Sequence, residues 1–196
     1  MTVRLFAAVV PPASVVDALD QLVGPRREAD ERLRWMTPDT WHVTTLFAEA
    51  VPEDSIEPLL EALGEVAAGR DPFEISLNGG GAFPDPATTR NLHLRVDRGA
   101  ELTGALARSC RATASRVGVA PDGTKFVPHL TLARTRTRFD SSRWLGILDS
   151  FGSFDWEADA LVVHESIQHR RGGHTYTEHR VLQRCPFGVD GASSAT

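Results

Sequence analysis

The sequence predicts an α+β fold. Apolar residues alternate with a period of two in several short segments, as in strands, and recur at helical spacing in others. The strands are too many for a helical bundle, and strands and helices do not alternate strictly as in a βαβ fold. Two similar stretches, TPDTWHVTTLF at 37–47 and TKFVPHLTLAR at 124–134, suggest two halves of one pseudo-symmetric domain.

The first half of the chain predicts three strands and two helices. RLFAAVV, near the N-terminus, is expected to be a strand. Residues 12–24 carry apolar side chains at helical spacing behind two prolines, and residues 52–68 repeat the pattern with Pro and acidic residues in the first turn. FEISLN and NLHLRV alternate as strands, and GGGAFPDPATTR between them is expected to be a loop because it is rich in Gly and Pro.

The second half predicts two further helices and a C-terminal hairpin. Residues 99–117 are helical by composition, 129–134 form a strand, and 141–150 form a short amphipathic helix. ALVVHESIQ and HTYTEHRVLQ flank an Arg-Gly-Gly turn, which is typical of a hairpin. We expect one domain over residues 1–186 and a disordered tail over 187–196.

Composition excludes several classes of function. With 41% hydrophobic and 24% charged residues the chain is of ordinary globular type, and we expect no membrane segment, no secretory signal and a cytoplasmic location. Cys110 and Cys185 are far apart, which favours two structural thiols over a disulfide or a zinc finger. The formal charge of −5 argues against non-specific coating of nucleic acid, although one RNA end could still bind.

Each of the two similar stretches contains a His-x-Thr motif. Because strand side chains alternate faces, His42 and Thr44 point one way, as do His129 and Thr131. Two such strands across a cleft would offer two imidazoles that titrate near neutral pH and two hydroxyl donors. This set suits in-line displacement at phosphorus, in which one His acts as base and the other as acid, without a metal or another cofactor.

Four stretches resemble the LigT-like 2′-5′ RNA ligase and RNA 2′,3′-cyclic phosphodiesterase family of the 2H phosphoesterase superfamily: RWMTPDTWHVTTLF, GGGAFPD followed by TTRNLHLRV, KFVPHLTLAR, and VVHESIQHRRGGHTYTEH. The resemblance spans nearly the whole chain. It implies a bilobal fold with two antiparallel-rich sheets that face a central cleft, with helices outside. It also implies an enzyme that opens terminal cyclic phosphates of RNA or a small nucleotide to 2′-phosphates, with reversible 2′-5′ ligation as a further activity. We expect the protein to be a monomer.

The resemblance assigns roles to five residues. It implies His42 as general acid, His129 as general base, Thr44 and Thr131 as phosphate holders, and Arg134 as a further phosphate contact. Strand parity turns Arg134 away from the face of Thr131, so this last role requires a local twist or a strand end.

An aromatic side chain could stack on the terminal base of the substrate. His93 stands near a position where many family members carry Trp, which leaves Phe83 and Phe126 as aromatic candidates.

The sequence leaves three other functions open. The cleft could bind a cyclic phosphate without turnover, or a related enzyme could act on ADP-ribose cyclic phosphate or 2′-5′ oligoadenylate. A metal site is suggested by histidines that recur every five residues: His164, His169, His174 and His179. A hairpin pairing His164 with His179 and His169 with His174 would put the two pairs on opposite faces, so four ligands could not converge. A site of two histidines completed by other residues is left open.

Overall fold

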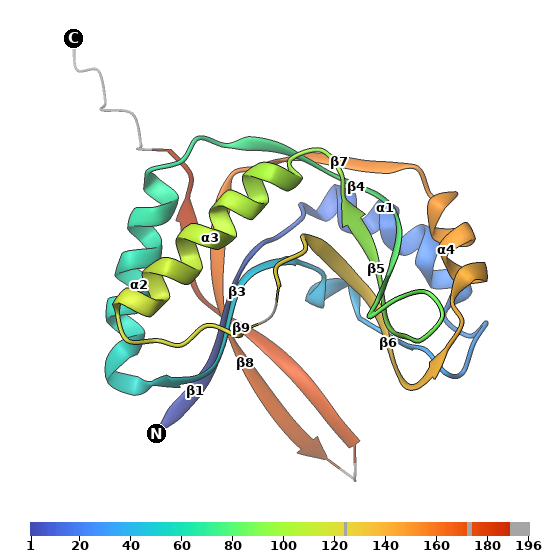
Figure 1. Ribbon diagram of the computed structural model, residues 1–196, viewed down its shortest axis with the longest axis horizontal. Coiled ribbons are helices and arrows are strands. Elements are labelled where there is room, and N and C mark those ends of the chain that lie inside the picture. Colours follow the sequence, from blue (N-terminus) through green and yellow to red (C-terminus); the bar gives the residue numbers. More distant parts are fainter. Residues whose placement is uncertain (124, 172–173, 189–196) are drawn as a thin grey trace.

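The computed structural model of the chain describes residues 1–123, 125–171 and 174–188, without the side chains of residues 170, 171 and 174–176. Nine strands form one curled antiparallel sheet (Figure 1). The strands are β1 (Thr2–Val9), β2 (Arg34–Trp35), β3 (Val43–Pro52), β4 (Phe73–Phe83), β5 (Thr89–Val96), β6 (His129–Phe139), β7 (Ser153–Ala158), β8 (Ala160–Arg171) and β9 (His174–Pro186). Their order is β7-β4-β5-β6-β3-β1-β8-β9, and β2 pairs with β6 outside this path.

The sheet has two halves that meet in the middle of this order. The pairing between β3 and β6 consists of one residue pair, Val43 with Leu130. On one side of this junction lie β3, β1, β8 and β9, and on the other lie β6, β5, β4 and β7. The α+β class and the two-part architecture predicted from the sequence are confirmed. The two sheets, however, are joined by backbone hydrogen bonding at this junction and are not separate.

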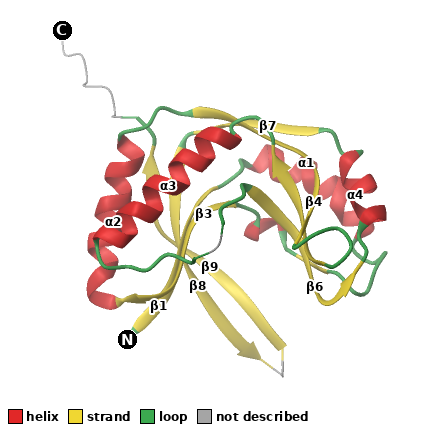
Figure 2. Cartoon of the chain, viewed as in Figure 1, coloured by secondary structure: helices red, strands yellow, loops and turns green. Residues whose placement is uncertain are grey.

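Four α-helices pack on the outside of the sheet (Figure 2). They are α1 (Ala13–Val23), α2 (Glu53–Ala68), α3 (Ala100–Arg116) and α4 (Ser142–Asp149). Helices α2 and α3 contact each other and the half that contains β3 and β9, whereas α1 and α4 contact β7 and β4 of the other half. Among the described residues, none of these helices is both long and apolar enough to span a membrane.

One hydrophobic core holds the two halves together. It includes fully buried leucines from three helices and from β6, namely Leu19, Leu59, Leu106 and Leu130. The core side of β3 also contains a hydroxyl, Thr45, which is 1% exposed. Its Oγ1 donates to the carbonyl oxygen of Ala7 at 3.0 Å, which offsets the cost of burying a polar group. Both cysteines are buried and free, as the sequence predicted.

Some element boundaries differ from those expected. Strand β4 continues through GGGAF, residues 79–83, which the sequence predicted as loop, because this glycine run pairs with β5 after a register shift between Leu77 and Gly80. Strand β7 was not predicted, although Phe154, Trp156 and Ala158 alternate with polar residues as in a half-buried strand. Phe187 is buried and stacks on Phe73, so the structured part extends past residue 186, while residues 189–196 lie outside the described chain.

The C-terminal hairpin is confirmed, but its expected register is wrong. Strands β8 and β9 pair as far as Arg171 with His174, so His164 lies opposite Val181 and His179 opposite Ser166. The hairpin extends beyond the rest of the sheet (Figure 1). Because the pairing is shifted by two residues from the predicted one, His164 and His179 are diagonal neighbours on one face, not direct partners.

Candidate active site

Both His-x-Thr motifs line one cavity of about 430 Å³. His42 directly precedes β3 and His129 begins β6, so the antiparallel junction at Val43 and Leu130 brings the motifs together. Because the two strands are antiparallel, His42 is next to Thr131 across the junction, and Thr44 is next to His129. The structure therefore places all four predicted motif residues around one space.

The two histidines are oriented in the same way. Nδ1 of His42 lies 2.7 Å from the carbonyl oxygen of Thr40, and Nδ1 of His129 lies 2.7 Å from the carbonyl oxygen of Val127. A carbonyl oxygen can only accept, so each Nδ1 carries the hydrogen and each Nε2 is left for proton exchange. The repeated bond to residue i−2 fixes the same tautomer in both halves.

The electrostatic environment keeps both free imidazoles neutral at pH 7. Burial, followed by the charge of His179, lowers the pKa of His42 to about 3. Burial also lowers the pKa of His129, and the positive charge of Arg134 lowers it further, against the opposing hydrogen bond to Val127. An anion in the cavity would raise both pKa values, because opposite charges favour the protonated imidazole.

Thr131 is held by a chain of hydrogen bonds that begins at β5. Nδ2 of Asn91 donates to Oγ1 of Thr131 at 3.0 Å, and Oδ1 of Asn91 accepts from Nδ1 of His93 at 3.1 Å. Thr131 thus receives a hydrogen bond on its oxygen, which leaves its own O–H to donate into the cavity. Burial lowers the pKa of His93 to about 3, so His93 stays neutral in this chain.

Gly81 makes room for the imidazole of His93, where the chain of hydrogen bonds to Thr131 begins. It lies opposite His93 in the β4–β5 pairing, where a Cβ would overlap Nε2 of the imidazole. The role of Asn91 was not predicted from the sequence. The available signal was its position two residues before His93, on the same face of a predicted strand.

Arg134 faces the cavity although simple strand parity turns it away. In the β5–β6 pairing Leu92 lies opposite Ala133 and His93 opposite Thr131, so Leu132 is an extra residue in β6. Such a β-bulge shifts the alternation, and both Leu132 and Ala133 are buried as a result. The parity expectation was therefore wrong, and Arg134 lies on the same side of β6 as Thr131.

An aromatic side chain packs against each histidine of the two motifs. The ring of Phe6 stacks on His42 with centroids 4.5 Å apart, and the ring of Phe83 lies edge-on to His129 at 4.9 Å. Phe83 also stacks on His93 at 4.3 Å, so it borders the site, while Phe126 lines a smaller adjoining hollow of about 100 Å³.

The hairpin histidines do not gather as metal ligands in the described part of the chain. His164 stacks on Phe6, and neither of its ring nitrogens is hydrogen-bonded to a described residue. His179 lines the cavity with its ring centroid 5.4 Å from that of His42. His169 bonds Glu178 instead, with 2.7 Å between Nε2 and Oε2. The side chain of His174 lies outside the described residues.

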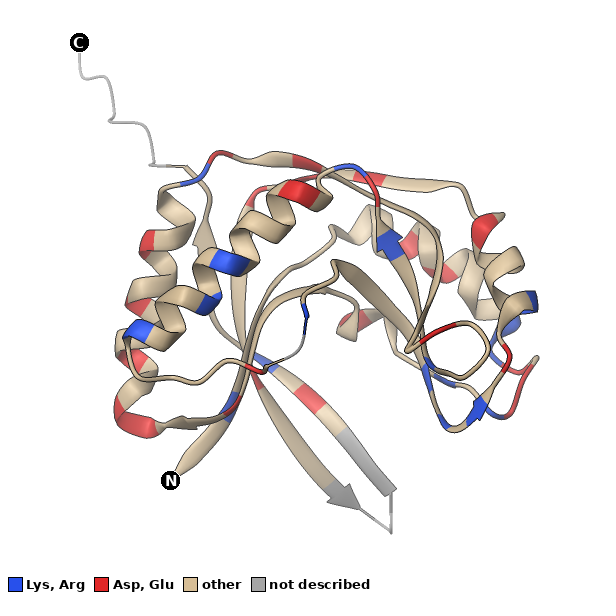
Figure 3. Ribbon diagram, viewed as in Figure 1, with Lys and Arg blue, Asp and Glu red and all other residues tan. Residues whose placement is uncertain are grey.

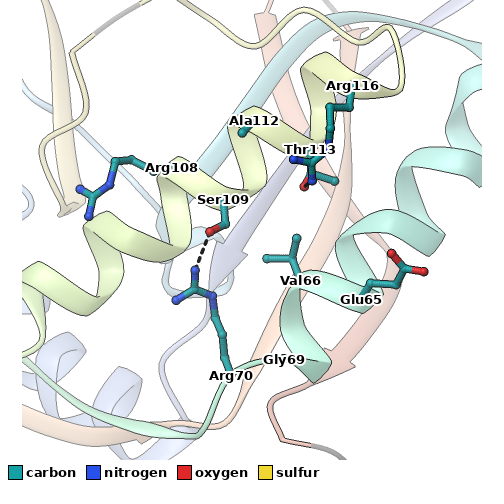
Figure 4. A pocket seen from close by; sticks show the side chains of 9 residues that line it. All are labelled: Glu65, Val66, Gly69, Arg70, Arg108, Ser109, Ala112, Thr113 and Arg116. Atoms are coloured by element: carbon teal, nitrogen blue, oxygen red, sulfur yellow. Dashed lines mark hydrogen bonds between the residues drawn. The ribbon is translucent and has the colours of Figure 1, made fainter.

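A larger hollow, of about 590 Å³, lies between α2 and α3 and shares no lining residue with the histidine cavity (Figure 4). Its arginines do not converge. Arg70 reaches Oγ of Ser109 at 2.6 Å, Arg116 reaches Oγ1 of Thr113 at 2.6 Å, and Arg108 points elsewhere. Among the described residues, its lining contains no histidine, so this hollow does not supply the pair of imidazoles that the chemistry considered above requires.

A curled antiparallel sheet with one His-x-Thr motif on each of two adjoining strands defines a phosphoesterase of the two-histidine class. Residues 9–93 match the family model described as LigT like Phosphoesterase. Two relatives are named RNA 2′,3′-cyclic phosphodiesterase. That of Methanothermobacter thermautotrophicus is 30% identical over 69% of this chain and 73% of its own. That of Archaeoglobus fulgidus is 33% identical over 69% and 74%. The chain belongs to the LigT-like phosphoesterase family and is an enzyme of that class.

Solved structures show the same fold. The Thermus thermophilus protein TT0787 superposes with a TM-score of 0.75 at 24% identity, over 95% of this chain and 99% of its own. The apo form of E. coli LigT gives a TM-score of 0.71 at 21% identity, over 95% of this chain and 98% of its own. Both comparisons extend beyond the residues matched by the family model, so the LigT fold includes the C-terminal hairpin.

Proposed function

We propose that this enzyme is a metal-independent RNA 2′,3′-cyclic phosphodiesterase that opens a terminal cyclic phosphate to a 2′-phosphate. The observation that carries the proposal is the pair of identically oriented histidines on adjoining strands, with both Nε2 atoms left for proton transfer. The names of the relatives in Methanothermobacter thermautotrophicus and Archaeoglobus fulgidus support the substrate.

In the first step, Nε2 of His129 accepts a proton from water as the water oxygen attacks phosphorus. The bond between phosphorus and the 3′ oxygen breaks, and Nε2–H of His42 donates its proton to that oxygen. The products are a free 3′-hydroxyl and a 2′-phosphate. The proton gained by His129 equals the proton lost by His42, so the enzyme returns to its starting state by exchange with solvent.

The other polar groups stabilise the charge that develops on phosphorus. The hydroxyls of Thr44 and Thr131 donate to the non-bridging oxygens, and Arg134 supplies a positive charge farther along the same wall of the cavity. Binding of the anionic substrate raises the pKa of His42, so the acid becomes protonated in the complex although it is neutral in the free enzyme. With a 5′-hydroxyl in place of water, the same steps form a 2′-5′ linkage, which we propose as a slower reversible reaction.

The test is to incubate the purified protein and EDTA with a short RNA that ends in a 2′,3′-cyclic phosphate. We expect turnover and a 2′-phosphate product, identified by chromatography against authentic 2′- and 3′-phosphates. His169→Ala is a matched control, because His169 lies on the other face of the hairpin. Activity that disappears with the chelator and returns with a divalent ion would refute the mechanism. Binding without turnover would favour a binding module, and turnover of 2′-5′ oligoadenylate alone would favour another substrate.

A further inference from the structure

Two arginines face each other at one end of the histidine cavity. Arg34 of β2 and Arg134 of β6 are direct cross-strand partners, and both line the cavity. Burial, followed by the charge of Arg34, lowers the pKa of Arg134. Both side chains are exposed to solvent, which screens their repulsion, but like charges placed directly opposite each other still favour an anion bound between them.

The third arginine of the cavity lining, Arg4, and two arginines outside it, Arg111 and Arg32, pair with carboxylates. Arg4 pairs with Glu49 at 2.8 Å and Arg111 with Asp122 at 2.7 Å. Just before β2, Arg32 pairs with Asp30 at 2.7 Å.

In the described part of the chain, neither Arg34 nor Arg134 has a carboxylate within ion-pair distance. Figure 3 shows basic segments along β6 near this end of the sheet. Two uncompensated guanidinium groups in one cavity form a site for an anion that arrives with the substrate.

A cyclic phosphate alone does not account for both charges. It carries one negative charge, and the two His-x-Thr motifs already surround it. Arg134 is three residues beyond Thr131 in sequence but, because of the bulge, only two pairing positions beyond it on the same face of β6, a displacement of about 7 Å along the strand. The arginine pair therefore extends the site away from the reacting phosphorus, toward the position of a neighbouring phosphate.

We propose that Arg34 and Arg134 form a second phosphate subsite, which binds the phosphate on the 5′ side of the terminal nucleotide. The enzyme would then distinguish the 3′ end of an RNA strand from a nucleoside 2′,3′-cyclic phosphate that lacks a 5′-phosphate. This inference rests on the proposed function, because it takes the cyclic phosphate to lie between the two histidines.

The experiment compares a nucleoside 2′,3′-cyclic phosphate with the same compound bearing a 5′-phosphate. The wild-type enzyme should turn over the 5′-phosphorylated compound with a kcat/KM about ten- to a hundredfold higher, the effect of one charge-assisted contact. Arg34→Gln should reduce this ratio by about tenfold, mainly through KM. Arg136→Gln removes the same charge from the same strand outside the cavity, and it should keep the wild-type ratio.

A wild-type enzyme that turns over both compounds equally would overturn the second subsite and leave the proposed function intact. Equal losses on both compounds in Arg34→Gln would also overturn it, because the arginine would then act on the reacting phosphate. Calorimetry with two product analogues tests the subsite without turnover. A nucleoside 2′,5′-bisphosphate should bind more tightly than the 2′-monophosphate, and Arg34→Gln should remove that difference. Equal binding of the two compounds to the wild type would overturn the subsite. Absence of turnover alone would contradict only the proposed function.

Discussion

Replacing Asn91 with Asp should reduce catalysis far more than the small change in size suggests. In the wild type, Nδ2 of Asn91 donates to Oγ1 of Thr131 at 3.0 Å, so the threonine hydrogen is available to a phosphate oxygen. A carboxylate at position 91 can only accept, and it would still receive the hydrogen bond from His93. The hydroxyl of Thr131 would then have to donate to Asp and would turn away from the phosphate.

The expected magnitude follows from which hydrogen bond is lost. Removing one preformed donor to a developing charge costs roughly 10²–10³-fold in kcat, and we expect Asn91→Asp to fall in this range. Asn91→Ala only removes a neutral hydrogen bond to Thr131, which contributes about 1 kcal/mol, so a loss of about fivefold is expected. The difference between the two variants measures the direction of the hydrogen bond.

The assay is single-turnover cleavage of an RNA with a 2′,3′-cyclic phosphate, with a thermal melt of each variant to confirm folding. Thr131→Val removes the same donor, so it should lose about as much as Asn91→Asp, and the double variant should lose little more than either one. Equal rates for Asn91→Asp and Asn91→Ala would refute the argument. Fully additive losses in the double variant would also contradict it, since the two changes would then act independently.

The three further predictions concern the two histidines and the charge of Arg134. His42→Ala and His129→Ala should each lower kcat by roughly 10²–10⁴-fold, and the loss in the double variant should be smaller than the product of the two. An activated aryl phosphodiester should rescue only His42→Ala, because its leaving group needs no proton. Rescue of His129→Ala instead would reverse the assigned roles. The lowered pKa values of free His42 and His129 place the optimum of kcat/KM below about pH 6.5. Activity requires a protonated His42, which loses its proton as the pH rises, and a neutral His129, which becomes protonated as the pH falls. Arg134→Gln removes a charge that lowers both pKa values, so its kcat/KM profile should move to higher pH, and a shift to lower pH would count against the electrostatic account.

The motif residues could be predicted from the sequence because their placement depends on local geometry. Two residues separated by one position on a strand share a face, and this rule places His42 beside Thr44 and His129 beside Thr131. The helices and the longer strands follow from periodicity in the same way. Nothing in this reasoning required knowledge of which strands pair.

The features that could not be predicted depend on pairing between distant segments. The face of Arg134 is set by the extra residue in β6, which exists only relative to β5. The role of Asn91 depends on the neighbouring strand that carries Thr131, and the partnership of Arg34 with Arg134 depends on a strand of only two residues. The shifted register of the C-terminal hairpin is likewise a property of two strands together.

The interleaved strand order affects how the enzyme can assemble during synthesis. The half that contains His129 uses β2 and β4 to β7, so all its strands are available once residue 158 has been added. The half that contains His42 uses β1 and β3 from early in the chain, but β1 pairs on its other side with β8. Until β8 emerges, β1 has an open edge that could pair with other chains. The catalytic cavity is therefore completed last, when the hairpin docks and supplies Ser166, Gln168 and His179 to its wall.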